Sequence, residues 1–180
     1  CAEMVQKGIT RASAIIENVL TFARPSDNAD FVPLDILAVL NEMFRLVAYE
    51  ARTQKIELVP DLPNERIVVN GNKGLLQQVF MNLFLNAIKA MPKGGKLRTS
   101  VARSGSEVLI RVADTGCGIP QEALAKVFDP FYTMLPMGAE TGLRLSLCYS
   151  IVKEHLGSIE VESTAGVGTT LTVRLPVVTG

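Results

Sequence analysis

A carboxylate and two closely spaced glycines follow directly on a predicted β-strand. Residues 107–113 alternate between apolar and polar side chains, which is typical of a strand. Asp114 comes next, and then Gly116, Gly118 and Pro120 turn the chain where its backbone can approach a ligand closely. Taken alone, this pattern is as typical of a plain β-turn as of a binding site.

A predicted helix over residues 75–91 carries three polar side chains on one stripe. Its apolar residues recur at helical spacing, which predicts a broad buried face. Asn82, Asn86 and Lys89 occupy positions i, i+4 and i+7 and therefore lie along one side. Two amides and an ammonium so placed suit a hydrated Mg²⁺ ion and phosphate oxygens. For an isolated helix, a solvated polar edge is the simpler interpretation.

Two further segments contain glycines next to predicted elements. Residues 138–146 lead into a predicted helix that ends near His155. Such a loop presents free N–H groups and the positive end of a helix dipole to an anion. The alternative is an ordinary loop with Thr141 as the helix cap. Residues 166–176 predict a glycine turn and a strand, which alone form a simple hairpin.

Together these segments resemble the ATP-binding catalytic domain of bacterial sensor histidine kinases, in the superfamily shared with gyrase, MutL and Hsp-type chaperone ATPases. The N box, first glycine box, F box, second glycine box and third glycine box of that family are similar to residues 82–87, 114–120, 127–132, 141–146 and 166–169. The resemblance extends from Phe31 to about Val177. It implies that the chain binds ATP together with Mg²⁺.

The resemblance implies a set of residues around the base and ribose. Asp114 would accept a hydrogen bond from the adenine amino group, with Thr169 nearby, through an ordered water. Gly116 and Gly118 would let the backbone pass close to the base and ribose, and Ile119 would contact the nucleotide. These residues form the adenine side of the expected site.

At the phosphate side, the resemblance implies both metal binding and catalysis. Asn86 would supply an oxygen to Mg²⁺, with Asn82 beside it, and Lys89 would reach the phosphates. Asn86 and Lys89 are therefore the expected catalytic residues, and Asn86 is the expected metal ligand.

A flap over the nucleotide, the ATP lid, is expected between the F box and the second glycine box. Phe128 and Phe131 would be its hinge aromatics, although a small satellite core is an equally simple and compatible interpretation. Gly142 and Leu143, in the second glycine box, would contact the nucleotide.

The lid region departs from the family pattern. Met134 and Leu135 stand where a Thr-Lys pair is expected, and Glu140 and Arg144 replace glycines. Leu156, directly after His155, also stands where the family has a glycine. Without the lysine, the γ-phosphate lacks a positively charged neighbour, and the carboxylate of Glu140 would repel the phosphates. For Arg144, steric interference is weighted slightly above the alternative of a phosphate contact.

Composition is that of one globular domain. A length of 180 residues with 48% hydrophobic content is enough for one core. Eighteen basic and eighteen acidic residues cancel, which gives no electrostatic basis for binding nucleic acid or an acidic membrane. No segment is as long as an apolar membrane span. The three cysteines are widely spaced and not arranged as metal ligands, which favours a reduced, cytoplasmic location.

Three regions are expected along the chain. Residues 1–25 resemble the end of the dimerisation and phosphotransfer hairpin, 26–30 a linker, and 31–180 the ATP-binding catalytic domain. The hairpin helix with the phosphoacceptor histidine is not in the sequence, which starts at Cys1, so we expect a piece that is inactive alone. His155 is expected to be a packing or surface residue.

The expected fold is α+β, a two-layer α/β sandwich of the Bergerat type, with helices on one face of a mixed, mostly antiparallel sheet and an additional N-terminal helix. Strands are predicted over residues 31–34, 56–59, 67–69, 96–103, 107–113, 158–163 and 169–175. Helices are predicted over residues 35–53 and 121–127, with a third that begins at Asn72 and a fourth that ends near His155.

Two functions remain open from the sequence. The first is a kinase core that transfers the γ-phosphoryl group of Mg·ATP to a histidine on a hairpin helix. The second is a nucleotide-binding or degenerate module with an altered lid that acts by docking. Expected partners are its own hairpin and a response regulator receiver domain, in a full-length homodimer, without nucleic acid or membrane contact by this chain.

Overall fold

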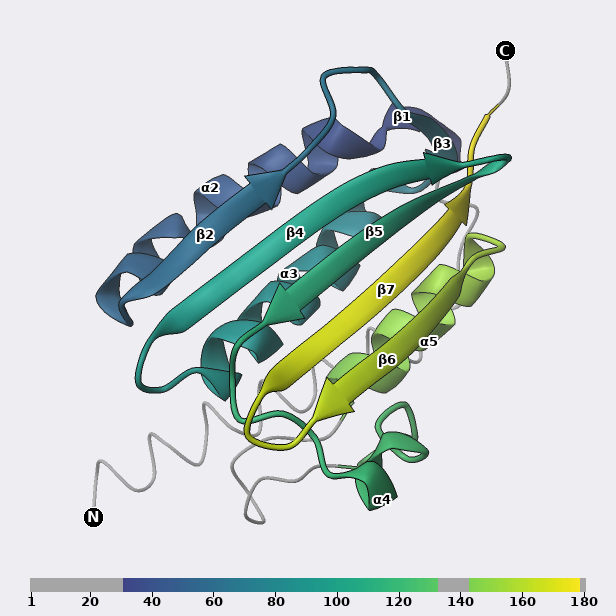
Figure 1. Cartoon of the computed structure of the whole chain (residues 1–180). Helices are drawn as coiled ribbons and strands as arrows, with labels where there is room; N and C mark the ends of the chain where they lie inside the picture. The colour runs from purple at the N-terminus through teal and green to yellow at the C-terminus, as the bar shows by residue number, and fades with distance from the viewer. Residues whose placement is uncertain (1–30, 133–142, 179–180) are drawn as a thin grey trace, which may run out of the picture.

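The computed structural model describes residues 31–132 and 143–178 (Figure 1). The predicted N-terminal helix and linker, and the lid positions from Met134 to Gly142, lie outside the described residues. Along the chain the elements are β1 (Val32–Asp35), α2 (Ile36–Thr53), β2 (Ile56–Asp61), β3 (Val68–Gly71), α3 (Lys73–Ala90), β4 (Gly95–Ser104), β5 (Glu107–Asp114), α4 (Gln121–Leu124), α5 (Arg144–Glu154), β6 (Ser158–Thr164) and β7 (Gly168–Pro176).

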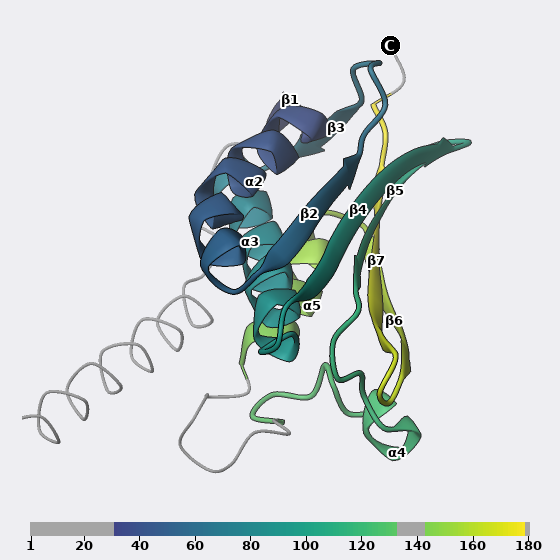
Figure 2. The same ribbon diagram turned by 60° about the vertical axis from the view of Figure 1, so that its left-hand side comes forward.

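These elements form two layers. Five strands make one sheet in the order β2-β4-β5-β7-β6, in which only the β2–β4 pair is parallel. Helices α2, α3 and α5 lie against one face of this sheet, as the edge-on view shows (Figure 2). The two-stranded β1–β3 sheet stands beside them. The predicted α+β sandwich with a mixed, mostly antiparallel sheet is confirmed.

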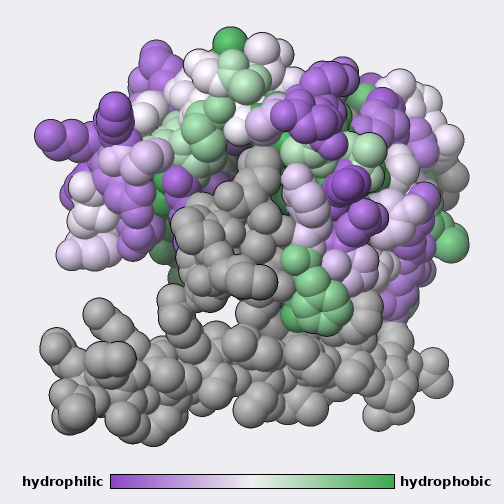
Figure 3. All heavy atoms as spheres, turned by 90° about the horizontal axis from the view of Figure 1, so that it is seen from below, coloured by the Kyte–Doolittle hydropathy of each residue, from purple (hydrophilic) through white to green (hydrophobic). Residues whose placement is uncertain are grey.

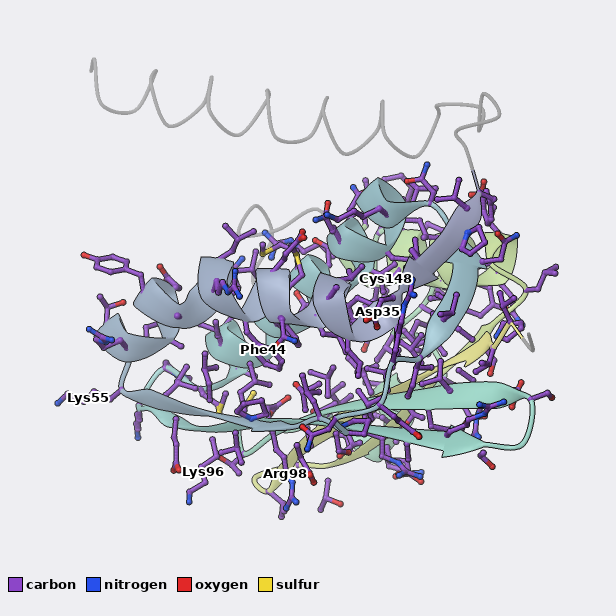
Figure 4. The ribbon with its side chains drawn as sticks, turned by 90° about the horizontal axis from the view of Figure 1, so that it is seen from above. Asp35, Phe44, Lys55, Lys96, Arg98 and Cys148 are labelled. Atoms are coloured by element: carbon purple, nitrogen blue, oxygen red, sulfur yellow. The ribbon has the colours of Figure 1, made fainter. Side chains whose placement is uncertain are left out.

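The core lies between the helices and the sheet, with α3 at its centre. Phe80 and Phe84 of α3 are fully buried, and the Phe84 ring stacks on Phe44 of α2 at 4.9 Å between centroids. On the opposite face of the sheet, Lys96 and Arg98 point away from the helices (Figure 4). Of the helices that the structure describes, none is long and apolar enough to cross a membrane.

The predicted helix starts are confirmed for α2 and α3. Asp35 Oδ1 accepts a hydrogen bond from the Leu37 N–H at 3.0 Å, and Asn72 Oδ1 accepts one from the Leu75 N–H at 3.0 Å. Each side chain satisfies an N–H group that the first helical turn leaves without a backbone acceptor. Both caps are aspartate or asparagine just before an apolar-periodic run, so local sequence was sufficient to locate them.

The helix predicted over residues 121–127 is wrong in its length, because α4 ends at Leu124. Beyond it the N–H groups of Lys126 and Asp129 bond to carbonyls three residues back, at Ala123 and Lys126, which makes successive turns. Pro120 precedes the helix and has no side-chain acceptor to cap it. Without a cap, the short apolar run does not extend beyond about one helical turn.

His155 is a packing residue that joins the start of α3 to the end of α5. Its Nδ1 donates to the Ile151 carbonyl at 2.7 Å, and its Nε2 accepts from the Asn72 N–H at 3.0 Å. The Phe31 ring lies 4.6 Å from the imidazole ring, centroid to centroid. A side chain at Gly71 would come within 2.6 Å of the imidazole, so glycine is required there.

Replacement of Leu156 by glycine is expected to stabilise the domain by about 0.5–1 kcal/mol. Leu156 has a φ of 57° and is 84% exposed, so the leucine has backbone strain and little packing. Urea unfolding of both forms measures the difference. Val167→Gly is the matched control, because Val167 is 68% exposed without a positive φ and should lose stability. Equal losses in both variants would contradict the strain at Leu156.

Candidate functional site

A cavity of about 300 Å³ lies between α3 and the sheet. Its lining comes from α3, the end of β5, the turn after β5, the start of α5 and β7, and consists of Leu83, Asn86, Ala87, Lys89, Ala90, Val112, Asp114, Cys117, Gly118, Ile119, Leu145, Thr169 and Leu171. Most of these side chains are apolar, with a few polar groups among them, which is typical of a small-molecule site.

Asp114 is the carboxylate of this cavity. Its Oδ1 accepts the Gly116 N–H at 2.8 Å, and the Thr169 N–H also bonds to the carboxylate. Burial raises the pKa of Asp114 above its ordinary value, and the two N–H groups oppose that rise. A half-buried carboxylate with these two bonds is fixed in orientation and can accept a further bond from a ligand donor.

Ser163 holds Thr169 in place and was missed by sequence reasoning. Its hydroxyl donates to the Gly168 carbonyl at 2.8 Å and lies 2.9 Å from Thr169 Oγ1. It also accepts the Ile119 N–H at 2.8 Å. Since the only proton of Ser163 goes to Gly168, Thr169 donates to Ser163 and keeps its lone pairs for a ligand. Ser163 pairs with Thr169 across the β6–β7 hairpin, so the hairpin register was the signal available.

The glycines of the first and third boxes are needed because the backbone segments approach closely. Gly118 has a φ of 67°, and a Cβ there would lie 2.1 Å from the Thr164 carbonyl oxygen. At Gly168 the φ is 146°, and a Cβ would lie 2.0 Å from the Asp114 carbonyl oxygen. A Cβ at Gly116 would lie 2.5 Å from the Ala90 carbonyl oxygen. Gly118 lines the cavity, whereas Gly116 packs against the end of α3.

On the phosphate side, the structure separates residues that the sequence placed together. Asn86 and Lys89 line the cavity, and Asn82 does not. The Asn82 side chain instead bonds to the thiol of Cys148 on α5, which opposes the effect of burial that raises the Cys148 pKa to about 12. Lys89 stands at the exposed rim; loss of some surrounding water lowers its pKa, and the charge of Arg144 lowers it further.

The residues present fit a magnesium ion that takes most of its oxygen ligands from a bound nucleotide and from water. In the part of the chain that the structure describes, no group of three His, Cys, Asp or Glu side chains could hold a metal ion by itself. Mg²⁺ prefers oxygen ligands and commonly takes one or two from the protein, with the rest from phosphates and water. The amide oxygen of Asn86, on the cavity wall, fits that role.

The expected hinge aromatics and Leu143 lie outside the cavity lining. Phe128 packs against the core with its ring 5.8 Å from Tyr149, whereas Phe131 is 70% exposed with a φ of 67°. Figure 3 views the end of the domain that carries α4, where hydrophobic side chains stand among hydrophilic ones. Leu143 is buried, and Gly142 lies outside the described residues.

Comparison with known proteins identifies the family of this chain. A family model for histidine kinase-, DNA gyrase B-, and HSP90-like ATPases matches residues 71–179. The chain is 34% identical over 175 residues to the signal transduction histidine-protein kinase AtoS of Escherichia coli (strain K12), covering 97% of this chain and 28% of AtoS. Sporulation kinase C of Bacillus subtilis (strain 168) is also 34% identical over 175 residues, covering 97% of this chain and 40% of that kinase. The chain therefore spans well under half the length of these relatives.

Solved structures of histidine kinases share this fold. The nucleotide-free catalytic domain of histidine kinase ThkA is 29% identical, with a TM-score of 0.74, over 82% of this chain and 95% of that one. ThkA in complex with the response regulator protein TrrA gives a TM-score of 0.78 at 25% identity, over 96% of this chain and 49% of that one.

Proposed function

The chain belongs to the family of histidine kinase-, DNA gyrase B-, and HSP90-like ATPases and carries the catalytic domain of a sensor histidine kinase; from this premise we propose that its cavity binds Mg·ATP for phosphoryl transfer to a histidine. The acceptor histidine would be on a dimerisation hairpin. His155 is not a candidate acceptor, because it is buried and both ring nitrogens are engaged.

One observation supports this proposal above the others: a single cavity has a carboxylate, a hydroxyl, an amide and an ammonium in its otherwise largely apolar lining. Asp114 and Thr169 come from the paired strands β5 and β7, and Asn86 and Lys89 come from the facing helix. The apolar lining between them suits a flat base, whose desolvation favours binding. The two sets of polar groups suit the two ends of one nucleotide.

The protein's part in the reaction would be positioning and charge neutralisation. Asp114 orients the base through its amino group, and Lys89 offsets the negative charge of the phosphates. Mg²⁺, with Asn86 as its protein ligand, would neutralise further phosphate charge when bound. The γ-phosphoryl group moves to a ring nitrogen of the acceptor histidine as its bond to the oxygen of ADP breaks.

The partners follow from the same proposal. The domain would act on the hairpin of its own protein in a homodimer, and the phosphohistidine would then pass its group to a receiver domain. Supporting this, the similar kinase ThkA has been solved in complex with the response regulator protein TrrA. A cytoplasmic location is proposed with it, since neither Cys117 nor Cys148 is in a disulfide.

A cysteine in the cavity wall gives a direct test of nucleotide binding. Cys117 is exposed and lines the cavity, so bound nucleotide should cover its thiol. At a concentration about ten times its Kd, Mg·ADP is expected to slow alkylation of Cys117 about tenfold. Mass spectrometry of the Cys117 peptide in a Cys1→Ser variant measures the rate.

The buried thiol provides an internal control. Cys148 is fully buried with its pKa raised to about 12, so it should stay unmodified in the folded domain with or without nucleotide. Modification of Cys148 would reveal unfolding. An unchanged Cys117 rate at millimolar Mg·ADP would contradict nucleotide binding in this cavity.

A further inference from the structure

Arg144 opens α5 on the side of that helix that faces α3. Cys148, one turn later, is fully buried, and its thiol donates to the Val79 carbonyl of α3 at 3.8 Å. Residues at i and i+4 share one helix face, and the charge of Arg144 acts on the Cys148 thiol. The guanidinium therefore lies toward α3, the helix that carries Asn86 and Lys89.

The register of the two helices places Arg144 beside the end of α3. Helices α3 and α5 run antiparallel, because His155 at the end of α5 bonds to the Asn72 N–H at the start of α3 and Cys148 bonds to Val79. Arg144, one turn before Cys148, therefore lies beside the last turns of α3, which carry Asn86 and Lys89.

Arg144 is half-buried, and its positive charge contributes to the lowered pKa of the Lys89 ammonium at the cavity rim. Two like charges, each partly removed from water, repel each other. A multiply charged anion bound beside both would relieve that repulsion, so the arrangement favours anion binding.

The backbone around Arg144 is fixed at the cavity. Leu145 lines the cavity, and Leu143 is buried. The Leu143 carbonyl accepts bonds from the Leu147 N–H and the Ser146 hydroxyl, both at 3.0 Å. With both neighbours anchored, the Arg144 side chain starts from a fixed backbone position next to the cavity that Lys89 also lines. A planar guanidinium recognises phosphate by paired hydrogen bonds, which an ammonium cannot make.

We propose that Arg144 and Lys89 together bind the terminal phosphates of the nucleotide, and that Arg144 sets the preference of the site for nucleotides with two or three phosphates over the bare nucleoside. This assigns Arg144 the phosphate contact, the second of the two roles that the sequence left open. The inference rests on the proposed nucleotide site and adds a specificity-determining residue from α5.

The test compares ligands that share the base and differ in phosphates. Binding of adenosine (by NMR titration), ADP and a non-hydrolysable ATP analogue (by calorimetry) is measured for the parent chain, Arg144→Gln and Arg144→Lys. For Arg144→Gln we expect ADP and the analogue to bind about tenfold more weakly, with adenosine affinity within about twofold. Arg144→Lys should fall between, because it keeps the charge and lacks the planar fork.

Lys153→Gln is the matched control. Lys153 is a cation on the same helix, more than two turns after Arg144, and its ammonium lies over the Tyr149 ring, 5.5 Å from the centroid. Its removal should leave all three affinities unchanged. Thermal unfolding of each variant checks that it is folded, and Arg144→Lys keeps the comparison decisive if the glutamine variant unfolds.

The outcomes separate this inference from the proposed function. If the parent binds adenosine and ADP and Arg144→Gln binds ADP equally well or more tightly, Arg144 does not bind phosphate and the inference is overturned, while the nucleotide site stands. If the parent binds none of the three ligands, the proposed function fails and the inference fails with it.

Discussion

Asp114→Asn is expected to weaken ATP binding by about 10- to 150-fold, which corresponds to roughly 1.5–3 kcal/mol, the range for a hydrogen bond to a charged group. The carboxylate is half-buried in the cavity lining and fixed by the Gly116 and Thr169 N–H groups. An asparagine that keeps its oxygen toward Gly116 offers the adenine amino group a weaker acceptor or a second donor. Calorimetric titration with Mg·ADP and an ATP analogue measures the loss.

The loss of affinity should not come from unfolding. Because the pKa of Asp114 is raised, the folded state binds this proton more tightly than the unfolded chain does. The ionised carboxylate therefore costs stability above its folded pKa, and stability from this group returns as the pH falls through it. Asparagine removes that cost and gives up part of the bonding to two N–H groups. The two effects oppose each other, so the free energy of unfolding should change little.

Base selectivity gives the sharpest readout of Asp114. GTP presents a carbonyl where ATP presents an amino group, so the carboxylate should reject it and ATP should bind far more tightly than GTP. Asp114→Asn should reduce the ratio of ATP affinity to GTP affinity. Asp129→Asn is the control, since Asp129 is exposed and does not line the cavity. Equal affinity of the parent for ATP and GTP would contradict the role of Asp114.

Local sequence predicted those parts of the fold that local interactions determine. The caps of α2 and α3 depend on Asp35 and Asn72, each within three residues of the N–H group it accepts from. The first part of strand β4 follows the alternation that one buried face imposes, whereas Val108, Leu109 and Ile110 of β5 are all buried. The sequence predicted Asp114 directly after a strand, and the structure makes it the last residue of β5 and places it in the cavity lining.

Contacts between distant segments of the chain could not be predicted from the sequence. Asn82 and Asn86 lie on one side of α3, but only the Asn82 side chain bonds to Cys148 of α5. Ser163 and His155 likewise have their roles through the β6–β7 register and the approach of α5 to Asn72. Sequence periodicity identifies the face of a helix, and only packing decides which neighbour each side chain on it meets.

Asn86→Ala is expected to abolish the gain in ATP-analogue affinity that Mg²⁺ gives the parent. Its amide is the expected protein ligand of the metal on the cavity wall. Affinity measured in EDTA should stay within about threefold, because Asp114 and the apolar lining hold the base without the metal. With a histidine-bearing hairpin supplied separately, the rate of phosphoryl transfer should fall about a hundredfold or more, roughly 2.7 kcal/mol of barrier.

Asn82→Ala is the informative comparison, because the two amides lie one helical turn apart and only Asn86 reaches the cavity lining. Loss of Asn82 removes one of the two partners of the buried Cys148 thiol, the other being the Val79 carbonyl. The variant should therefore have lower thermal stability and keep most of the Mg²⁺-dependent gain in affinity. Equal loss of the Mg²⁺ effect in both variants would place both amides at the metal. An unchanged Mg²⁺ effect in Asn86→Ala, with transfer at the parent rate, would remove Asn86 from the metal site. Asn82 and Asn86 lie on the same side of α3, so helical spacing alone predicts the same Mg²⁺ effect for both variants. A difference in the Mg²⁺ effect between Asn86→Ala and Asn82→Ala therefore measures the consequence of packing against α5.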